Sequence, residues 1–295
     1  MPDDMPTLPE VDALKGKTFL VCLGAAKCGT SWLHNYLDSL SDMTVSPLKE
    51  LHFFNAKFAG LAMGDMQALA IKRLALHLNR EGDLVDTLTH SPDFQASLDA
   101  VQMIYDESAY FAHFARLARS ETRAFCDITP GYSVLGPNGM DYMAKIFATQ
   151  PELRLRLLLI LRDPVDRLWS QLRHLEEINP KSVATKRWEN ALKSQPIMGR
   201  CDYAGTVSDL DMTFGADQVC YVFYEDLFAE ETLRDLCDFV GVEYRPGAVS
   251  ERQNKSAVTA DLPDAAREAF RAALDGQYAF CRERFGPRIP ASWAG

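Results

Sequence analysis

FLVCLGAAKCGTSWLHNYL, residues 19–37, runs from an apolar segment into a short turn and then into an amphipathic helical pattern. We expect a buried strand ending at Leu23, then a tight loop over residues 24–29 and a helix. Such a loop directs successive backbone N–H groups and the positive end of the helix at one point. This arrangement is typical of a site for a phosphate or sulfate group.

The side chains of the loop suit the same role. Gly24 and Gly29 allow a tight backbone path, and Lys27 adds a positive charge inside it. Thr30 and Ser31 supply hydroxyl donors and a helix N-cap. The alternative is an ordinary strand–turn–helix connection with a solvated lysine, because turns built from small residues are common.

The position of the lysine separates this loop from that of the nucleotide triphosphatases. Their loop reads GxxxxGK[ST], with the lysine directly after the second glycine. Here Thr30 occupies that position, and Lys27 precedes Gly29. A metal-dependent nucleotide kinase also needs an acidic residue at a strand end for magnesium, where this chain has Arg162. Both features argue against a kinase.

Composition and charge exclude several classes of protein. With 295 residues, 47% of them hydrophobic, the chain can bury a full core. The formal net charge of −10 argues against a nucleic-acid binder. No apolar run approaches the roughly 20 residues of a membrane span, and the acidic, proline-rich start does not read as a signal peptide. The 7 cysteines show neither CxxC nor metal-ligand spacing, which favours a reduced, cytoplasmic location.

Strands and helices alternate along the chain, which predicts an α/β fold. We expect three layers, a central parallel sheet of about five strands flanked by helices. The expected strands are 18–23, 43–46, 123–128, 155–161 and 218–223. The expected helices are 30–39, 65–79, 106–120, 139–148, 164–177, 230–240, 263–273 and 277–285. Residues 1–295 show no repeat or linker and are predicted to form a single domain, with residues 56–122 as a helical insertion over the sheet edge.

A second segment, RDPVDRLWS, residues 162–170, follows an expected strand. Asp163 followed by Pro164 is a favourable N-cap and first-turn pair. Arg162 therefore falls at the carboxyl end of a strand, where ligands of open α/β sheets bind, and Ser170 about two turns into a helix. Taken alone, Arg162 is equally an ion-pairing residue at a helix end, and Ser170 a surface hydroxyl.

Together the two segments resemble the sulfotransferases that use 3′-phosphoadenosine 5′-phosphosulfate (PAPS). KCGTSWL, residues 27–33, is similar to the 5′-phosphosulfate loop of that family, K-x-G-T-[ST]-x-L. Residues 162–170 are similar to its 3′-phosphate motif, in which an arginine and a serine bracket the 3′-phosphate. The resemblance implies a P-loop nucleotide-hydrolase-like fold, PAPS as donor, 3′-phosphoadenosine 5′-phosphate (PAP) as product, and no metal.

Further segments extend the resemblance over about residues 18–285. SPLKELHFF, residues 46–54, is similar to the K-E-x-H-F-F segment of the carbohydrate branch, which includes the heparan sulfate sulfotransferases. YVFYEDL, residues 221–227, is similar to the last core strand of the family. CDITPGY, residues 126–132, resembles an E-K-T-P-x-Y segment, but Ile128 stands where a substrate-side lysine occurs. Asn55 also replaces an acidic residue. The absence of the lysine cation at position 128 weakens the case for an acidic glycan.

The resemblance implies a set of cofactor contacts. The loop positions contact the 5′-phosphosulfate, and Arg162 and Ser170 the 3′-phosphate. Arg252 and Lys255 lie where the family closes a loop over the cofactor, although its glycine-rich form is missing and a solvated loop is the equal alternative. The full set is Lys27, Cys28, Gly29, Thr30, Ser31, Trp32, Arg162, Ser170, Arg252 and Lys255.

Sulfuryl transfer needs a base for the acceptor hydroxyl and a positive charge for the leaving phosphate. Lys27 is the candidate for the leaving-group oxygen. Resemblance to the carbohydrate branch places the base at Glu50, whose apolar neighbours favour a raised pKa. The alternative is a loop carboxylate paired with Lys49. His52 is the rival base, with two further interpretations: a satisfied core histidine, or a group that orients Glu50.

The sequence thus predicts a sulfotransferase that moves the sulfuryl group of PAPS to a hydroxyl of a small-molecule or carbohydrate acceptor by in-line transfer. A P-loop nucleotide kinase and a catalytically silent nucleotide-binding scaffold are the alternatives, and the scaffold would tolerate loss of Glu50. No nucleic-acid or membrane partner is expected, and no oligomeric state is predicted. The aromatic set Tyr105, Tyr110, Phe111 and Phe114 is interpreted as core packing, with an acceptor pocket as the alternative.

Overall fold

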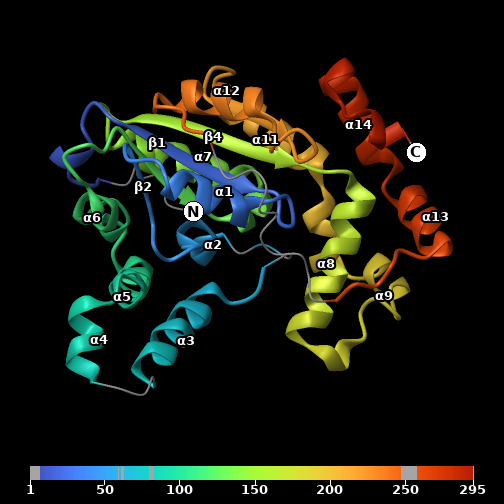
Figure 1. Cartoon of the computed structure of the whole chain (residues 1–295), viewed down its shortest axis with the longest axis horizontal. Coiled ribbons are helices and arrows are strands. Elements are labelled where there is room, and N and C mark those ends of the chain that lie inside the picture. The colour runs from blue at the N-terminus through green and yellow to red at the C-terminus, as the bar shows by residue number, and fades with distance from the viewer. Residues whose placement is uncertain (1–6, 59, 61–62, 80–82, 247–257, 295) are drawn as a thin grey trace.

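A computed structural model describes residues 7–58, 60, 63–79, 83–246 and 258–294. Five parallel strands form one sheet in the order β2–β3–β1–β4–β5 (Figure 1). The strands are β1 (Thr18–Gly24), β2 (Met43–Val45), β3 (Ala124–Ile128), β4 (Arg154–Leu161) and β5 (Val219–Phe223). β1 and β3 are buried along their whole length, as expected of parallel strands covered on both faces. The predicted strands and the α/β class are confirmed.

Helices flank the sheet. They are α1 (Thr30–Asp38), α2 (Phe53–Lys57), α3 (Met66–Leu78), α4 (Leu84–His90), α5 (Pro92–Tyr105), α6 (Ser108–Leu117), α7 (Gly136–Ala148), α8 (Pro164–Ile178), α9 (Glu189–Leu192), α10 (Gln195–Met198), α11 (Tyr203–Thr213), α12 (Glu230–Val240), α13 (Asp264–Ala273) and α14 (Asp275–Phe285). Two short 3-10 turns, η2 (Pro130–Val134) and η4 (Gly199–Cys201), border the site described below. All eight predicted helices are present.

Several helices escaped prediction. α9 and α10 have four residues each, which is too short to show a helical period. α11 begins YAGTV, where glycine and β-branched residues lower the intrinsic helix propensity. Packing of α11 against α7 stabilises it instead.

Two pairs of helices cover opposite faces of the sheet (Figure 1). α1 and α12 meet on one face, where Tyr36 Oη lies 3.6 Å from Cys237 Sγ. α7 and α11 pack together on the other face. The connection after β1 therefore leaves toward one face and the connection after β3 toward the other, which opens a crevice at the carboxyl end of β1.

Between β2 and β3 the chain forms α2 to α6, beside the edge strand β2. Tyr110, Phe111 and Phe114 of α6 are buried, and all three rings surround Phe19 of β1. The core interpretation of this aromatic set is confirmed for these three residues. It is wrong for Tyr105, which is 79% exposed at the end of α5. None of the described helices is long and apolar enough to cross a membrane.

Candidate active site

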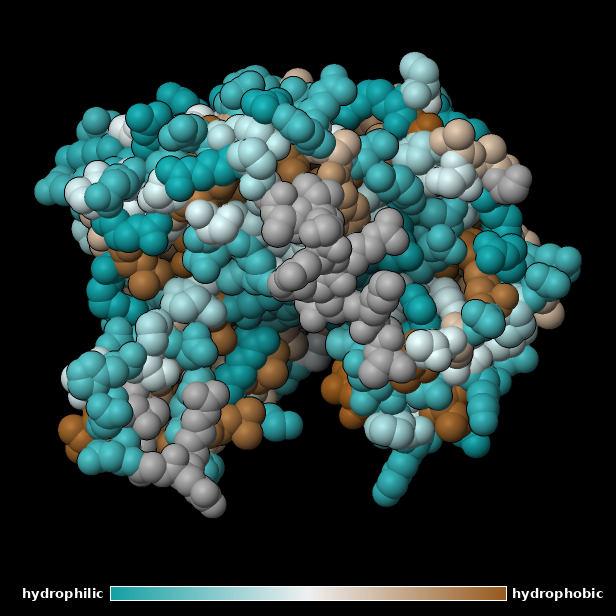
Figure 2. Space-filling model, viewed as in Figure 1, coloured by the Kyte–Doolittle hydropathy of each residue, from teal (hydrophilic) through white to brown (hydrophobic). Residues whose placement is uncertain are grey.

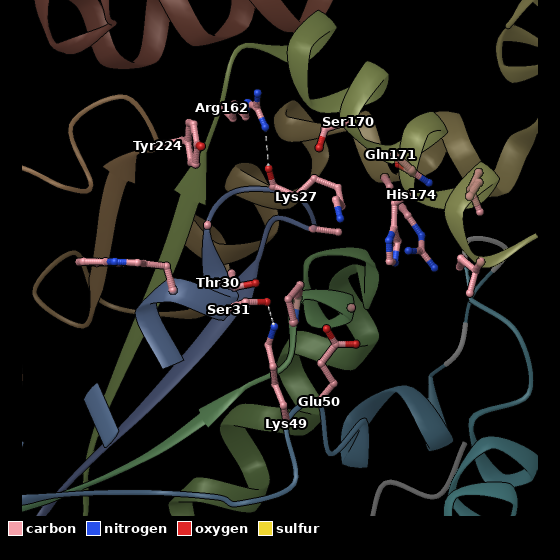
Figure 3. A pocket seen from close by; sticks show the side chains of 18 of the residues that line it. Lys27, Thr30, Ser31, Lys49, Glu50, Arg162, Ser170, Gln171, His174 and Tyr224 are labelled. Carbon is pink, nitrogen blue, oxygen red and sulfur yellow. Dashed lines mark hydrogen bonds between the residues drawn. The ribbon is translucent and has the colours of Figure 1, made fainter. Parts of the chain in front are cut away.

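A pocket of about 560 Å³ opens at the carboxyl edge of the sheet. Its walls include Lys27 after β1, Gly131 after β3, Arg162 after β4 and Tyr224 after β5. Segments distant in sequence meet here because the carboxyl ends of parallel strands share one edge. Figure 3 shows the loop after β1 at the centre of this pocket, with α8 above it.

The loop after β1 has a left-handed backbone at two positions. Lys27 has φ +70° and Gly29 has φ +80°. A Cβ at Gly29 would lie 2.8 Å from Leu227 Cδ2, in the segment after β5. This close approach and the positive φ of Gly29 both favour glycine here. Gly29 itself is the N-cap of α1, without a side-chain hydrogen bond. The predicted N-cap at Thr30 or Ser31 is wrong, because the left-handed glycine starts the helix one residue earlier.

The remaining loop side chains divide between the pocket and the core. Thr30, Ser31 and Trp32 line the pocket. Trp32 stacks on Tyr36 at a ring distance of 5.5 Å, which holds its plane. Cys28 does not line the pocket, because its side chain is buried in the core and burial raises the pKa of its thiol to about 12.

Arg162 lies at the end of β4 beside the loop. Its Nη1 donates to the carbonyl of Lys27 at 3.1 Å, and its Cζ lies 4.5 Å from the centre of the Tyr224 ring. Asp163 caps α8 by accepting from the N–H of Asp166 at 3.0 Å, as predicted. The cap sets the direction of α8 and brings Ser170 into the pocket wall with Arg162 (Figure 3).

The amine of Lys27 lies in a cationic part of the pocket. Burial lowers the pKa of Lys27 below its ordinary value. Glu177 and Glu50 oppose this effect, and the positive charge of Lys49 adds to it. An anion bound here would offset both the burial and the repulsion.

Glu50 and His52 form a close pair across the pocket from Lys27. His52 Nε2 lies 3.4 Å from Glu50 Oε2, and the Glu50 side chain is 36% exposed. In Figure 3 the Glu50 carboxylate points into the pocket from the side opposite Lys27. Both residues line the pocket, but His52 is 6% exposed, so the carboxylate is the more accessible of the two groups.

Backbone strain marks the same residues. Among described residues other than glycine, positive φ occurs at Lys27, Glu50 and His52 and at one further residue, Val183. Each left-handed residue costs on the order of 1 kcal/mol, and such strain gathers at functional sites. The three residues that the sequence proposed for catalysis are thus held in unfavourable backbone conformations by the surrounding fold.

The expected raised pKa of Glu50 is wrong in direction. Burial raises the pKa of this carboxyl and is the largest single effect. The hydrogen bond and positive charge of His52, together with the charges of Lys49 and Arg73, outweigh it, so the pKa lies below its ordinary value. The apolar residues next to Glu50 in the sequence predicted the wrong direction of the pKa shift, because cations from other segments surround the carboxylate. Glu50 is therefore ionised at neutral pH and can accept a proton.

A chain of hydrogen bonds orients His52. Asn55 Nδ2 donates to the carbonyl of Gly131 at 2.9 Å, so its Oδ1 accepts from His52 Nδ1 at 3.0 Å. This pattern assigns a hydrogen to Nδ1 and leaves Nε2 to exchange a proton with Glu50. A Cβ at Gly131 would lie 2.8 Å from Asn55 Oδ1, so glycine is needed where η2 approaches the pair.

Behind this chain lies a buried carboxylate, Asp127 at the end of β3. It accepts hydrogen bonds from Thr129 at 2.7 Å, Tyr132 at 2.9 Å and Tyr110 at 3.0 Å. Burial raises the pKa of Asp127, and the three hydroxyls oppose this effect. Asp127 therefore fixes the 129–132 turn, which carries the carbonyl of Gly131.

Lys49 belongs to the site although the sequence suggested only a pairing with Glu50. Its Nζ donates to Ser31 Oγ, which links the Glu50 segment to the loop after β1. Glu50 instead pairs with His52, so the alternative of a simple pair with Lys49 does not describe the geometry. Arg73 of α3 donates to the carbonyl of Glu50 at 2.7 Å and anchors the segment from the other side.

Several lining residues were missed from the sequence. Gln171 and His174 lie three residues apart on α8, next to and four residues after Ser170. This helical spacing was the signal that could have identified them. Arg200 of η4 and Met66 of α3 come from segments with no signal of their own. The remaining predicted contacts, Arg252 and Lys255, lie outside the described residues. Over the described ranges, no group of three or more His, Cys, Asp and Glu side chains gathers that could hold a metal ion.

Comparisons with known proteins identify the family and the fold of the chain. A model of the sulfotransferase family matches residues 20–246. The chain is similar to the crystal structure of a sulfotransferase from Alicyclobacillus acidocaldarius, with 22% identity, a TM-score of 0.64, and coverage of 94% of this chain and 98% of the other. That likeness shows a shared fold.

Two other solved structures are more distant. The sulfotransferase domain of the Synechococcus PCC 7002 olefin synthase is 16% identical, with a TM-score of 0.45 and coverage of 90% of this chain and 98% of the domain. A sulfotransferase from Mycobacterium avium is 13% identical, with a TM-score of 0.45 and coverage of 90% and 76%. No curated protein matches the sequence.

Proposed function

Since this chain belongs to the sulfotransferase family, we propose that it transfers the sulfuryl group of PAPS to the hydroxyl of an acceptor bound beside Glu50. The observation that carries the proposal is the opposition of Lys27 and Glu50 across one pocket. A cation faces the side where negative charge must develop, and an ionised carboxylate faces the side where a proton must leave.

The residues present fit the donor. Lys27 and the start of α1 offer a positive charge and backbone N–H groups for the 5′-phosphosulfate. Arg162 and Ser170 offer a guanidinium and a hydroxyl for a 3′-phosphate. Trp32 offers an aromatic face in the same wall. The lowered pKa of Lys27 supports the assignment, because an uncompensated cation gains from a bound anion.

PAPS would supply an activated sulfuryl group; the chain supplies position and charge. The acceptor oxygen forms a bond to sulfur as the bond from sulfur to the bridging phosphate oxygen breaks, and that electron pair leaves on PAP. The acceptor proton passes to Glu50, whose low pKa keeps it ionised before the transfer. His52 Nε2, 3.4 Å from Glu50 Oε2, orients this carboxylate. Lys27 stabilises the charge on the departing phosphate oxygen.

The first test concerns Arg162. We expect Arg162→Ala to weaken PAP binding by about 2 to 4 kcal/mol, because it removes one partner of a charged contact. Adenosine 5′-phosphosulfate, which lacks the 3′-phosphate, should lose much less affinity, because only the support of the Lys27 turn by Arg162 is removed. Arg154→Ala, at the exposed opposite end of β4, is the matched control and should bind PAP normally. Calorimetric titration measures the binding of both nucleotides to the wild type and to the two variants. Equal losses of affinity for both nucleotides in Arg162→Ala would show that Arg162 does not contact the 3′-phosphate.

The second test separates an enzyme from a silent scaffold. Glu50→Gln keeps the shape of the side chain but removes the base, so single-turnover transfer should fall by roughly 10² to 10⁴ while PAP affinity stays near that of the wild type. His52→Asn should cost less, because the His52 ring is less accessible than the Glu50 carboxylate. An active Glu50→Gln beside a folded but inactive His52→Asn would reverse the assignment of the base. Full activity in both variants would place the base elsewhere.

The alternative of a nucleotide kinase is tested in the same titration. Tighter binding of ATP with magnesium than of PAP would favour it, as would activity that EDTA abolishes and magnesium restores. Residues 1–295 are proposed to act as one sulfotransferase domain. A reduced, cytoplasmic location is part of the proposal and is supported by the 7 cysteines, all unpaired.

A further inference from the structure

The pocket continues beyond Glu50, away from the loop after β1, into a region that donor binding does not use. We call this region the acceptor end and define it by Met63, Met66 and Leu69 on one wall and Leu175 and Ile178 on the other. Its wall chemistry differs from that of the donor side, where hydroxyls and cations prevail. The side chains of the acceptor end therefore indicate the chemistry of the acceptor and not that of the donor.

One wall is a face of α3. Met66, Leu69, Arg73 and Leu76 are spaced three, four and three residues apart, so they lie on one side of the helix. Arg73 reaches the carbonyl of Glu50 at 2.7 Å, which fixes this side toward the reacting centre. Leu76 is 62% exposed and continues the apolar face outward. The wall thus runs from the base to the surface.

The facing wall is α8. Leu175 and Ile178 lie one turn apart, and Gln171 and His174 share their side of the helix. Ile178 is 68% exposed, an unusual exposure for a large aliphatic side chain at the rim of a pocket. In Figure 2 the surface is hollowed between α3 and α8, and hydrophobic residues occur on both sides of the hollow. An elongated apolar group would be covered on both sides.

The inner end of this region adjoins the catalytic pair. A Cβ at Gly131 would lie 2.9 Å from Met63 Cε and 3.1 Å from His52 Cε1, so the methyl of Met63 and the ring of His52 are neighbours. Arg200 Nη2 donates to Met63 Sδ at 3.2 Å and holds the methionine in place. The carbon next to an attacking hydroxyl would therefore meet an apolar surface.

These walls are poorly suited to binding a sugar. Its many hydroxyls would be buried largely against methionine, leucine and isoleucine, which costs free energy, and in the described lining of this end Gln171, His174 and Arg200 are the side chains that could partner them. The described residues of the acceptor end include no aromatic ring on which a sugar could stack, and Glu50 is the one carboxylate in the described lining. An alcohol with an extended hydrocarbon body needs neither feature.

We propose that the acceptor is a hydrophobic alcohol whose hydroxyl lies at Glu50 and whose hydrocarbon body extends between α3 and α8 toward Ile178. This inference rests on the proposed function and specifies its substrate class. The product is an amphipathic sulfate ester: the alcohol oxygen bonds to sulfur, PAP leaves with the electron pair of the broken sulfur–oxygen bond, and the proton goes to Glu50.

The test measures transfer from PAPS to straight-chain primary alcohols of increasing length, kept below their aggregation concentrations. Each buried methylene should raise kcat/KM roughly threefold to fourfold until the chain outgrows the pocket. Methyl glucoside and trehalose should react far more slowly than the longer alcohols. A flat length dependence, or faster transfer to the sugars, would overturn the inference.

Variants of the two walls locate the effect. Ile178→Gln and Leu69→Gln should reduce the gain per methylene to twofold or less. Ile178 is exposed, so its replacement should fold even if Leu69→Gln does not. Met212→Gln is the matched control, because Met212 is 74% exposed on α11 and does not line the pocket. A gain per methylene that is unchanged in Ile178→Gln would reject the proposed path of the chain.

PAP binding, measured in parallel, separates the two proposals. Absence of PAP binding would reject the proposed function itself. Normal PAP binding with transfer to sugars, or with no transfer to any alcohol of the series, would reject the hydrophobic acceptor and leave PAPS as the donor. Normal PAP binding with the expected length dependence supports both.

Discussion

Lys27 combines two energetically unfavourable features, and we expect a bound anion to compensate for them. Its backbone has φ +70°, and burial lowers the pKa of its amine. Arg162 Nη1 holds the strained turn by donating to the carbonyl of Lys27 at 3.1 Å. The backbone turn that carries Lys27 is thus held before any ligand arrives, which reduces the reorganisation that binding would require.

This environment makes nucleotide affinity sensitive to alkaline pH. The charged amine binds the anion, and its pKa in the free protein lies below the ordinary value, so affinity should be constant below that pKa and fall as pH rises through it. The loss should approach tenfold per pH unit for one lysine. Titration of PAP between about pH 7 and pH 10 measures it.

Lys27→Arg provides the matched control, because a guanidinium stays charged throughout this range. The fall in affinity should begin at a higher pH in this variant. The same pH dependence in wild type and Lys27→Arg would show that another group controls it.

Among the helices, α3 holds the Glu50 segment through one hydrogen bond. It belongs to the insertion between β2 and β3, yet Arg73 donates to the backbone carbonyl of Glu50, a residue with φ +62°. On the other side of this segment, Lys49 is tied to Ser31. The proposed base, Glu50, is therefore held between the insertion and the loop after β1.

We expect Arg73→Met to reduce the transfer rate by roughly 10- to 100-fold, the effect of a misplacement of about 1 Å at a reacting group. PAP affinity should change by less than about twofold, because Arg73 is not part of the donor side. Lys72→Met, at an exposed neighbouring position on α3, should behave as wild type. Equal loss of rate in both variants would indicate a general effect on the helix.

Across the whole molecule, ligand contacts come from segments joined through one sheet. The loops after β1, β4 and β5 all reach the pocket, and these strands are adjacent in the order β1–β4–β5. A nucleotide that bridges these loops stabilises the native sheet relative to the unfolded chain.

At 100 times its Kd, PAP should raise the free energy of unfolding by about 2.7 kcal/mol. For a chain of 295 residues this corresponds to a rise in Tm of about 4 °C. Thermal unfolding with PAP, adenosine 5′-phosphosulfate and ATP with magnesium measures it at matched concentrations. The rise should be smaller in Arg162→Ala, and a larger shift with ATP would contradict the assignment of the donor.

The amino-acid sequence by itself determined the strands, the position of the loop after β1 and the cap of α8. These features depend on spacing over a few residues: an apolar run, a glycine, or an Asp163–Pro164 pair fixes the local backbone wherever it occurs. The same spacing predicted that Lys27 and Arg162 follow strand ends. Parallel strands then bring such ends to one edge, so the meeting of these two residues in one pocket was predictable.

Tertiary structure alone decided the electrostatics of Glu50 and the identity of the acceptor end. The pKa of Glu50 depends on cations from other segments, His52 and Arg73 among them, and their distances from the carboxylate are not encoded in the neighbouring apolar residues. Arg200 and Leu69 carried no signal for the same reason. Their places in the pocket come from how α3, α8 and η4 pack, and packing depends on contacts between residues far apart in the chain.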